Sequence, residues 1–353
     1  MPFTGGLLAD ALSGIAFVGC SMLAPAAKAG ARRREVVVAG KRVKTVDIHA
    51  HCCVPEATQM AGVDIQPALL MRDAAEKTDR LAAMDAQGID MEALSINPVW
   101  YGTARDVAEP LIKLQNEKLA EIREAEPDRF TCFATAALQF PDLAVAQLDT
   151  AVRKMGFRGV SVGGSVNGEE LADPKFNPFW AKCEELGVLV FLHPQGTREL
   201  EAAGRLKGSG LLENTIGNPL ETTIALSHLI FEGTLDRYPG LKICAAHGGG
   251  YLPSYAARSD AVCKCFPNRV GPLPKKPPTA YLRQLYFDTI VFTPEALRHL
   301  THECGAGQIL MGTDFPYPWT STSVDHILST PGLSDADKVA MLGGTAMQLL
   351  GIK

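Results

Sequence analysis

The 353-residue chain lacks a surplus of basic residues, because 34 Lys and Arg stand against 39 Asp and Glu and the formal net charge is −5. Phosphate backbones are bound mainly by lysine and arginine, so we do not expect a nucleic acid as a partner. The sequence also lacks any apolar run that approaches the roughly 20 residues of a membrane-spanning helix. These absences predict a soluble protein with no membrane span.

Cysteine is present but lacks the dense, regular spacing of a disulfide-stabilised secreted domain. The nine cysteines are an odd number scattered from Cys20 to Cys304, which favours a reducing compartment and therefore a cytoplasmic location. Cys52–Cys53 and the pair Cys263 and Cys265 could be soft metal ligands. The alternative is that they are small residues of the core.

The N-terminal segment lacks the charge pattern of an export signal although it is apolar. The first thirteen residues contain no Lys or Arg, and the basic run Arg32 to Arg34 follows the apolar stretch 14–31. Export remains the alternative if this stretch belongs to a longer signal. Two β-prone segments that flank Ala39-Gly40 predict a hairpin. We therefore divide the chain into an N-terminal arm and hairpin, residues 1–44, and a catalytic domain, residues 45–353.

Short apolar segments alternate with amphipathic helical segments through the rest of the chain. This alternation predicts a (β/α)8 barrel of the TIM type. Two interruptions, residues 195–218 and the proline-rich residues 266–278, are long enough to be lids, subunit contacts or plain surface loops. We place the strands at 45–50, 92–97, 130–137, 158–162, 188–193, 241–247, 284–290 and 308–313, with helices at 79–87, 108–125, 143–155, 176–186 and 219–231.

Polar side chains follow four of the predicted strands. His49 and His51 close the first strand, His193 the fifth, His247 the sixth and Asp314 the eighth. Because the carboxyl ends of barrel strands meet at one rim, these side chains are expected to surround one cavity. Imidazole and carboxylate groups suit zinc or a similar divalent ion, with a coordination position left for water or substrate. Each residue alone could instead be a buried histidine or an aspartate that caps a turn.

The chain resembles the amidohydrolase superfamily, and within it the branch of aminocarboxymuconate semialdehyde decarboxylase and related nonoxidative aromatic acid decarboxylases. The resemblance covers nearly everything after residue 44. It rests on the segments Asp47 to His51, Met84 to Asp90, Leu192 to Pro194, Leu241 to Cys244, His247 to Gly250 and Gly312 to Pro316.

This resemblance implies that His49, His51, His193 and Asp314 bind a divalent metal, most simply Zn2+ with Mn2+ as an option. It implies that His247 transfers a proton beside Asp314 in the decarboxylation of an aromatic or unsaturated carboxylic acid. The resemblance also implies a homodimer in which Arg258 reaches the substrate carboxylate of the neighbouring subunit. Asp288, at the end of the seventh strand, could orient the His247 imidazole or make a structural hydrogen bond.

Two departures from the family pattern concern substrate recognition. Residues 55–70 contain no arginine, although the family decarboxylase has a substrate-binding arginine there, and Gln195 stands where that enzyme has a tryptophan. Gln195 is thus a candidate substrate contact, and Arg72, Arg198 or Arg205 could replace the missing cation or be surface residues. Hydrolysis of a lactone or amide is the alternative activity. A non-catalytic metal-binding protein is a more remote alternative.

Overall fold

A computed structural model describes residues 33–64 and 74–353 of the chain. The N-terminal arm before residue 33 and Arg72 lie outside the described residues. The predicted hairpin is present as β1 (Val37–Val38) and β2 (Lys41–Arg42), joined by Ala39 and Gly40. Both turn residues have positive φ, 49° and 76°, which is the backbone of the two-residue type I′ turn that hairpins favour.

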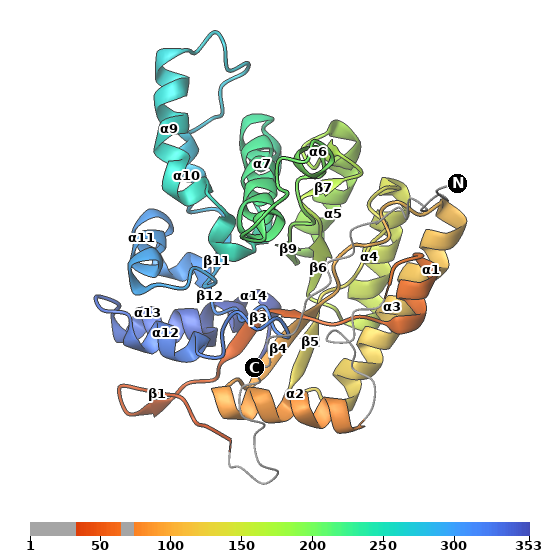
Figure 1. Ribbon diagram of the computed structural model, residues 1–353, viewed down its shortest axis with the longest axis vertical. Helices are drawn as coiled ribbons and strands as arrows, with labels where there is room; N and C mark the ends of the chain where they lie inside the picture. The colour runs from red at the N-terminus through yellow and green to blue at the C-terminus, as the bar shows by residue number, and fades with distance from the viewer. Residues whose placement is uncertain (1–32, 65–73) are drawn as a thin grey trace, which may run out of the picture.

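Eight parallel strands form the centre of the molecule (Figure 1). Each predicted strand is present, although most are shorter than expected. They are β3 (Val46–His51), β4 (Met91–Ser95), β5 (Phe130–Cys132), β6 (Gly159–Val162), β9 (Leu189–Leu192), β10 (Lys242–Ala245), β11 (Tyr286–Asp288) and β12 (Ile309–Leu310).

The strands are ordered β3-β4-β5 in one sheet and β6-β9-β10-β11-β12 in another. Main-chain hydrogen bonds join the two sheets at both seams. Ser161 N donates to Ala134 O at 2.9 Å between β5 and β6, and Ile48 N donates to Met311 O at 2.9 Å between β3 and β12. The strand order is therefore cyclic, which confirms the predicted (β/α)8 barrel.

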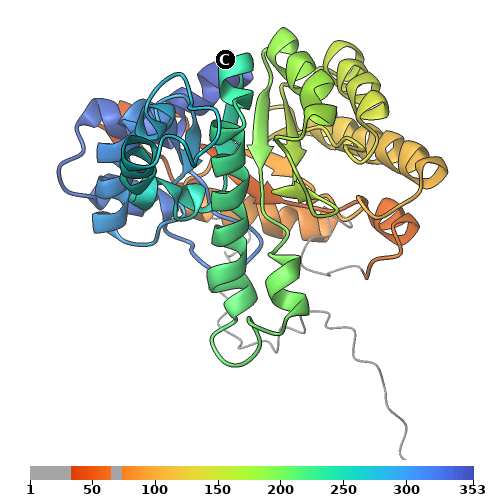
Figure 2. The same cartoon turned by 90° about the horizontal axis from the view of Figure 1, so that it is seen from above.

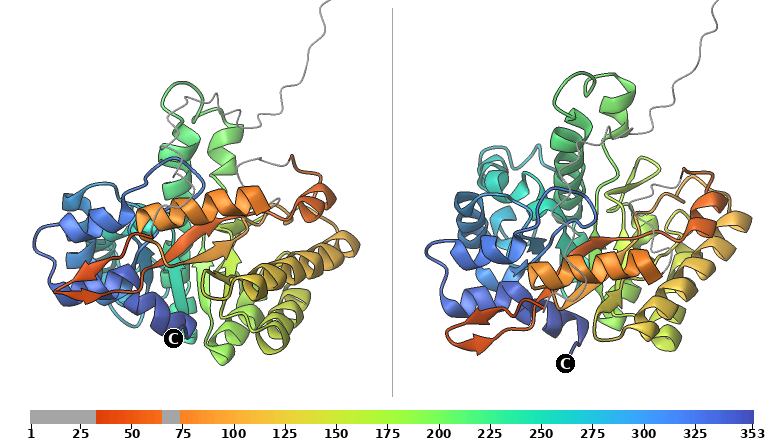
Figure 3. Two further views of the ribbon diagram at one scale, coloured as in Figure 1. Left: turned by 90° about the horizontal axis from the view of Figure 1, so that it is seen from below. Right: turned by 60° about the horizontal axis from the view of Figure 1, so that its bottom comes forward.

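The crossover helices cover the outside of the strands (Figures 1 and 3). All five predicted helices are present, as α2 (Ala74–Gln87), α3 (Arg105–Ala125), α4 (Pro141–Met155), α5 (Asn177–Leu186) and α7 (Asn218–Phe231). In the described residues the remaining helices are α1 (Pro55–Met60), α6 (Arg198–Ala202), α8 (Thr234–Arg237), α9 (Leu252–Cys265), α10 (Pro278–Tyr281), α11 (Pro294–Cys304), α12 (Ser323–Ser329), α13 (Asp335–Val339) and α14 (Thr345–Leu350). A small hairpin is formed by β7 (Ser165–Val166) and β8 (Glu169–Glu170).

The two predicted insertions lie outside the compact barrel. Figure 2 shows that the segment between β9 and α7, which includes α6, extends past the rim together with the start of α7. Figure 1 shows α9 and the loop that follows it above α10 and α11. In the described part of the chain, no helix has both the length and the apolar character to cross a membrane.

The apolar core extends up to the rim at which the predicted site residues meet. The Phe191 ring stacks on Phe133, with centroids 5.3 Å apart, and its edge contacts His49 at a centroid distance of 4.9 Å. β3, β4, β6 and β9 consist entirely of buried residues, as expected for parallel strands covered on both faces. The predicted polar cluster therefore rests on a rigid, close-packed base.

Candidate metal centre

His49 and His51, at the carboxyl end of β3, meet Asp314 from the segment after β12. The two Nε2 atoms are 2.9 Å apart. Asp314 Oδ1 lies 3.1 Å from His49 Nε2 and 3.0 Å from His51 Nε2. Two imidazole nitrogens and one carboxylate oxygen thus face a common point, which is the arrangement expected of ligands around one ion.

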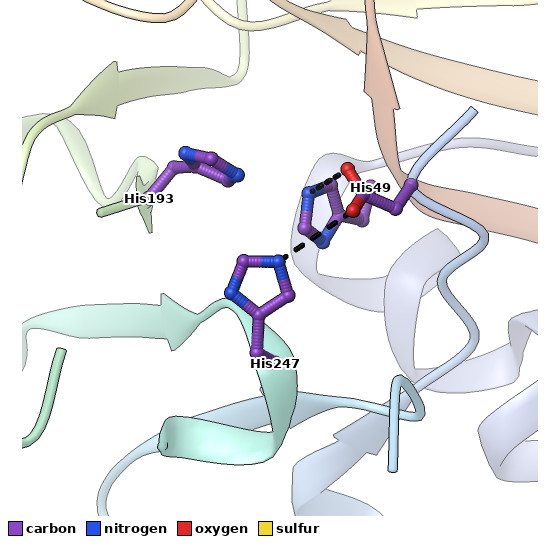
Figure 4. A group of neighbouring side chains, drawn as sticks. His49, His193 and His247 are labelled. Carbon is purple, nitrogen blue, oxygen red and sulfur yellow. Dashed lines mark ion pairs between the residues drawn. The ribbon is translucent and has the colours of Figure 1, made fainter. Parts of the chain in front are cut away.

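His193 and His247 complete the cluster from the ends of β9 and β10. Figure 4 shows the rings of His49, His193 and His247 turned toward a common centre. One nitrogen from each of these rings and one oxygen of Asp314 all lie within 4.8 Å of one another. His247 Nε2 is 3.6 Å from Asp314 Oδ2. The barrel therefore brings together all five residues that the sequence placed at strand ends.

Hydrogen bonds fix the orientation of three of the imidazoles. His49 Nδ1 lies 2.7 Å from Asp288 Oδ2, and His193 Nδ1 lies 2.8 Å from the carbonyl oxygen of Pro194. His51 Nδ1 lies 3.1 Å from the hydroxyl of Ser95, which donates to the carbonyl oxygen of Ala50. Each Nδ1 therefore donates, so Nε2 is the ring atom that each histidine can offer to an ion. Such partners orient the rings of metal-binding histidines.

The hydrogen bonds of Asp288 exclude one of the two roles that the sequence suggested for it. Its carboxylate accepts hydrogen bonds from His49 Nδ1 and from the backbone N–H groups of His247, Gly248 and Ile290. The Nδ1 of the His247 ring is buried and has no hydrogen-bond partner among the described residues. The expectation that Asp288 orients the His247 imidazole is thus wrong, because its oxygens are directed at His49 and at backbone groups.

His247 sits on an unusual backbone. Its φ is +55°, and the three glycines that follow it also have positive φ. A Cβ atom on Gly249 would lie 2.6 Å from the ring of Phe287, so a larger residue cannot occupy that position without displacing the strand. A left-handed turn of this kind is costly and persists where surrounding structure holds it. Here it directs the imidazole of His247 toward Asp314.

The electrostatics of the cluster suit a cation. Burial would raise the pKa of Asp314, but the imidazoles of His49, His247 and His51 hold it well below its usual range. Burial lowers the pKa of His51 to about 4 and also lowers that of His193. For His49, burial lowers the pKa, but the Asp314 and Asp288 carboxylates outweigh it and raise the pKa to about 10. Without metal, the cluster therefore contains neutral imidazoles at His51 and His193, an imidazolium at His49 and an ionised carboxylate at Asp314.

One buried atom shows directly that a cation fits. Asp314 Oδ1 is buried and accepts no hydrogen bond among the described residues. It lies about 3 Å from the Nε2 atoms of His49 and His51, whose rings donate through Nδ1, so three lone pairs converge here once an ion displaces the second proton of His49. Buried charged acceptors are stable only when a proton or an ion compensates them. The residues present thus fit a divalent metal.

A cavity of about 400 Å³ opens beside the cluster and reaches His193, His247 and Asp314. Gln195, the candidate substrate contact, lines this cavity, and its Nε2 donates to the carbonyl oxygen of Pro98 at 2.5 Å. Arg258 does not line the cavity and is exposed on α9, and Arg205 is also exposed and outside the lining. The other lining residues are Asn97, Val99, Pro194, Arg198, Asn214, Asn218, Tyr317 and Trp319.

Sequence reasoning missed most of these lining residues. Asn97 follows β4 and Tyr317 follows the segment of Asp314, so their positions after strand ends are a signal that could have identified them. Asn214 and Asn218 lie far from any strand end in the sequence. They reach the cavity because the segment between β9 and α7 lies at this rim of the barrel.

Comparisons with known proteins agree with this geometry. The family model "Amidohydrolase" matches residues 46–352. A 2-amino-3-carboxymuconate-6-semialdehyde decarboxylase of Dictyostelium discoideum is 30% identical over 280 residues, which cover 77% of this chain and 76% of that protein. A gamma-resorcylate decarboxylase of a Rhizobium species is 30% identical over 316 residues, which cover 83% of this chain and 94% of that protein.

A solved structure shares the fold and contains a metal. The dihydroxybenzoic acid decarboxylase of a Polaromonas species, with bound manganese and the inhibitor 2-nitroresorcinol, has a TM-score of 0.76 and 26% identity and covers 88% of this chain and 97% of its own. The chain belongs to the amidohydrolase family, as the predicted resemblance indicated. The three-histidine and aspartate cluster and the manganese of this neighbour support a divalent metal as cofactor.

Proposed function

We propose that this protein is a metal-dependent nonoxidative decarboxylase that acts on an aromatic carboxylic acid. The observation that carries the proposal is the convergence of His49, His51, His193, His247 and Asp314 beside a cavity large enough for a small aromatic acid. Relatives that cover most of the chain are named as decarboxylases of such acids. The hydrolase alternative has no comparable support.

In this proposal His49, His51, His193 and Asp314 hold the ion. A bound divalent ion supplies Lewis acidity, which stabilises negative charge on substrate oxygens. Nitrogen and oxygen donors accept both zinc and manganese. The manganese in the Polaromonas neighbour supports testing Mn2+ first, with Zn2+ second.

His247 is the proposed proton donor. Its side chain lines the cavity, is 16% exposed, and lies beside Asp314 at 3.6 Å. When the bond between the ring carbon and the carboxylate breaks, carbon dioxide leaves and the bonding electron pair stays on the ring carbon. The imidazolium of His247 donates a proton to that carbon and the neutral imidazole regains one from water. Asp314 stabilises the imidazolium, because the two groups are close and oppositely charged.

We further propose a homodimer that uses α9. Tyr255 is 65% exposed, and Arg258, one turn later, is exposed on the same face of the helix. An exposed tyrosine beside an arginine is typical of interface residues that contribute strongly to binding. Mixing His247→Gln and Arg258→Gln subunits tests this, because mixed dimers regain one complete site only if Arg258 acts across the interface. A mixture that stays inactive contradicts the role of Arg258.

The activity is tested with metal-loaded protein and a panel of hydroxylated aromatic acids and lactones. We expect carbon dioxide to be released from at least one acid and no lactone to be opened. Ring opening without carbon dioxide would establish hydrolysis instead. If the protein binds metal but turns over no compound, and His247→Ala leaves the metal binding unchanged, the result would indicate a non-catalytic metal-binding protein.

A further inference from the structure

Arg80 of α2 is buried and contacts three segments that meet beside the metal centre. Its side chain is 6% exposed. Its Nε donates to Glu92 Oε2 of β4 at 2.6 Å, and its Nη1 donates to the carbonyl oxygen of His51 at 3.0 Å. The guanidinium also covers the ring of Phe315, with Cζ 4.7 Å from the ring centroid. One side chain thus touches β4, the carboxyl end of β3 and the segment that follows β12.

The backbone of this last segment joins Asp314 to the end of β3. His51 N donates to Phe315 O at 2.6 Å, and Asp314 N donates to His49 O at 2.8 Å. Asp314 has a φ of +63°, a left-handed conformation that a residue other than glycine keeps only where its surroundings hold it. The 3.0 Å between His51 Nε2 and Asp314 Oδ1 therefore depends on this junction.

Arg80 holds both sides of the junction. The backbone of His51 is bonded through its N–H to Phe315 and through its carbonyl oxygen to Arg80. The same guanidinium covers the side chain that directly follows Asp314. Because the donors of a guanidinium lie in one rigid plane, a shift of either segment would break a hydrogen bond or the ring contact.

Compensation of the charge on Glu92 does not by itself explain this placement. Glu92 is 1% exposed, so its carboxylate requires a cation. Any cation that reached Glu92 would serve, without contacts to His51 and Phe315. The Nη2 of Arg80 is buried and has no hydrogen-bond partner among the described residues, and such a donor costs free energy. The contacts with the two ligand segments account for the position of the guanidinium better than Glu92 alone.

We propose that Arg80 is a positioning residue of the metal centre, which holds His51 and Asp314 at the separation that one divalent ion requires. This inference rests on the proposed function, because it assigns the group that keeps two of the proposed ligands together. Arg80 is not among the residues that line the cavity. It therefore acts on the ion through these two ligands and does not touch the substrate.

Arg80→Lys tests the inference, because lysine keeps the charge opposite Glu92 but lacks the planar fork and the flat face of arginine. We expect the affinity for Mn2+ to fall by about 10- to 100-fold, the usual effect of removing a group that orients metal ligands. Competition with a coloured chelator measures this affinity. The visible absorption spectrum of bound Co2+, which reports the ligand geometry, should also change.

Arg129→Lys is the matched control. Arg129 is also a buried arginine, which lies 2.8 Å from an oxygen of Asp85 and donates through Nε to the carbonyl oxygen of Asp90 at 2.9 Å. It directly precedes β5, so it lies at the end of the barrel opposite the metal centre. We expect Arg129→Lys to destabilise the metal-free protein, as Arg80→Lys does, but to leave the metal affinity and the Co2+ spectrum unchanged.

A second variant keeps the test decisive if Arg80→Lys does not fold. Phe315→Leu removes the ring contact but leaves the hydrogen bonds of Arg80 to Glu92 and His51 in place. We expect it to weaken Mn2+ binding by about two- to fivefold, which corresponds to one cation–π contact. An unchanged affinity would contradict the proposal that the ring contact helps to hold Asp314.

Two outcomes with Arg80→Lys would overturn the inference. They are an affinity for Mn2+ equal to that of the unmodified protein, and a loss of affinity that Arg129→Lys reproduces at an equal loss of stability. Turnover is measured separately. A selective loss of metal in Arg80→Lys, with no carbon dioxide released from any acid by the unmodified protein, would refute the decarboxylase proposal and leave the role of Arg80 intact.

Discussion

Asp288 accepts a hydrogen bond from Nδ1 of His49 at 2.7 Å, and both side chains are fully buried. The same carboxylate accepts from the backbone N–H groups of His247 and Gly248. Asp288 therefore links the ring of a proposed ligand on β3 to the turn that carries the proposed proton donor after β10.

Replacing Asp288 with Asn should weaken metal binding by about 10- to 100-fold, because the amide NH2 group would face backbone donors and the orientation of His49 would be lost. Competition with a coloured chelator measures the affinity. Asp128→Asn, at an exposed position, is the control. An Asp288→Asn protein that holds metal as tightly as the control would show that this hydrogen bond does not orient the ligand.

His247→Gln should lower turnover by about 10²- to 10⁴-fold, the usual contribution of a general acid, while the metal content stays constant. Elemental analysis and carbon dioxide release are measured on the same preparation. If metal is lost in proportion to activity, His247 is a ligand and not the proton donor. Ligand and proton donor must be distinguished in this way because His247 Nε2 lies only 3.6 Å from Oδ2 of Asp314, which is itself a proposed ligand.

Metal binding to the metal-free protein should release about one proton per ion between pH 7 and 9. The His49 pKa is raised to about 10 in the folded, metal-free protein, so its proton stabilises the fold fully below the unfolded value near 6.5 and is lost as pH rises through about 10. The pKa values of His51, about 4, and of His193 are lowered, so these rings carry no proton to displace. Affinity should therefore rise with pH in this window.

Calorimetry in buffers of different protonation enthalpy counts the released proton. A proton count near zero across this pH window would mean that His49 is already neutral before the metal binds. In that case the Asp314 and Asp288 carboxylates do not hold an imidazolium in the metal-free site.

Glu221→Ala should lower the free energy of unfolding by about 3 kcal/mol, because the buried backbone N–H groups of Gln195 and Gly196 lose their acceptor. Glu221→Gln should retain most of this stability, since its amide oxygen can accept from both groups. Urea unfolding of the two variants provides the measurement. Equal destabilisation by Ala and Gln would show that the negative charge, and not the hydrogen-bond geometry, holds the loop after His193.

Local sequence patterns were sufficient to predict the barrel strands and the polar residues that follow them. Strand-length apolar runs and helical periodicity are patterns among neighbours in the chain, so they reveal each strand. His49, His193 and Asp314 were then identified because they stand at the ends of these strands. The rule that barrel strands end at one rim then predicted that these residues would meet.

Other contacts depend on groups that approach only when the barrel closes. Asp288 was assigned to the wrong imidazole because its distance from two candidate rings is set by strand packing and not by spacing. Arg198, Asn214 and Asn218 carry no local signal that separates them from surface residues, and they line the cavity because the segment between β9 and α7 lies at the rim in the folded chain. The sequence alone thus determined the fold class, through its periodicity, and which polar residues stand at the strand ends that meet at one rim. The tertiary structure decided which groups orient the ligands and which side chains meet a substrate, because hydrogen bonds and cavity walls require distances between remote segments.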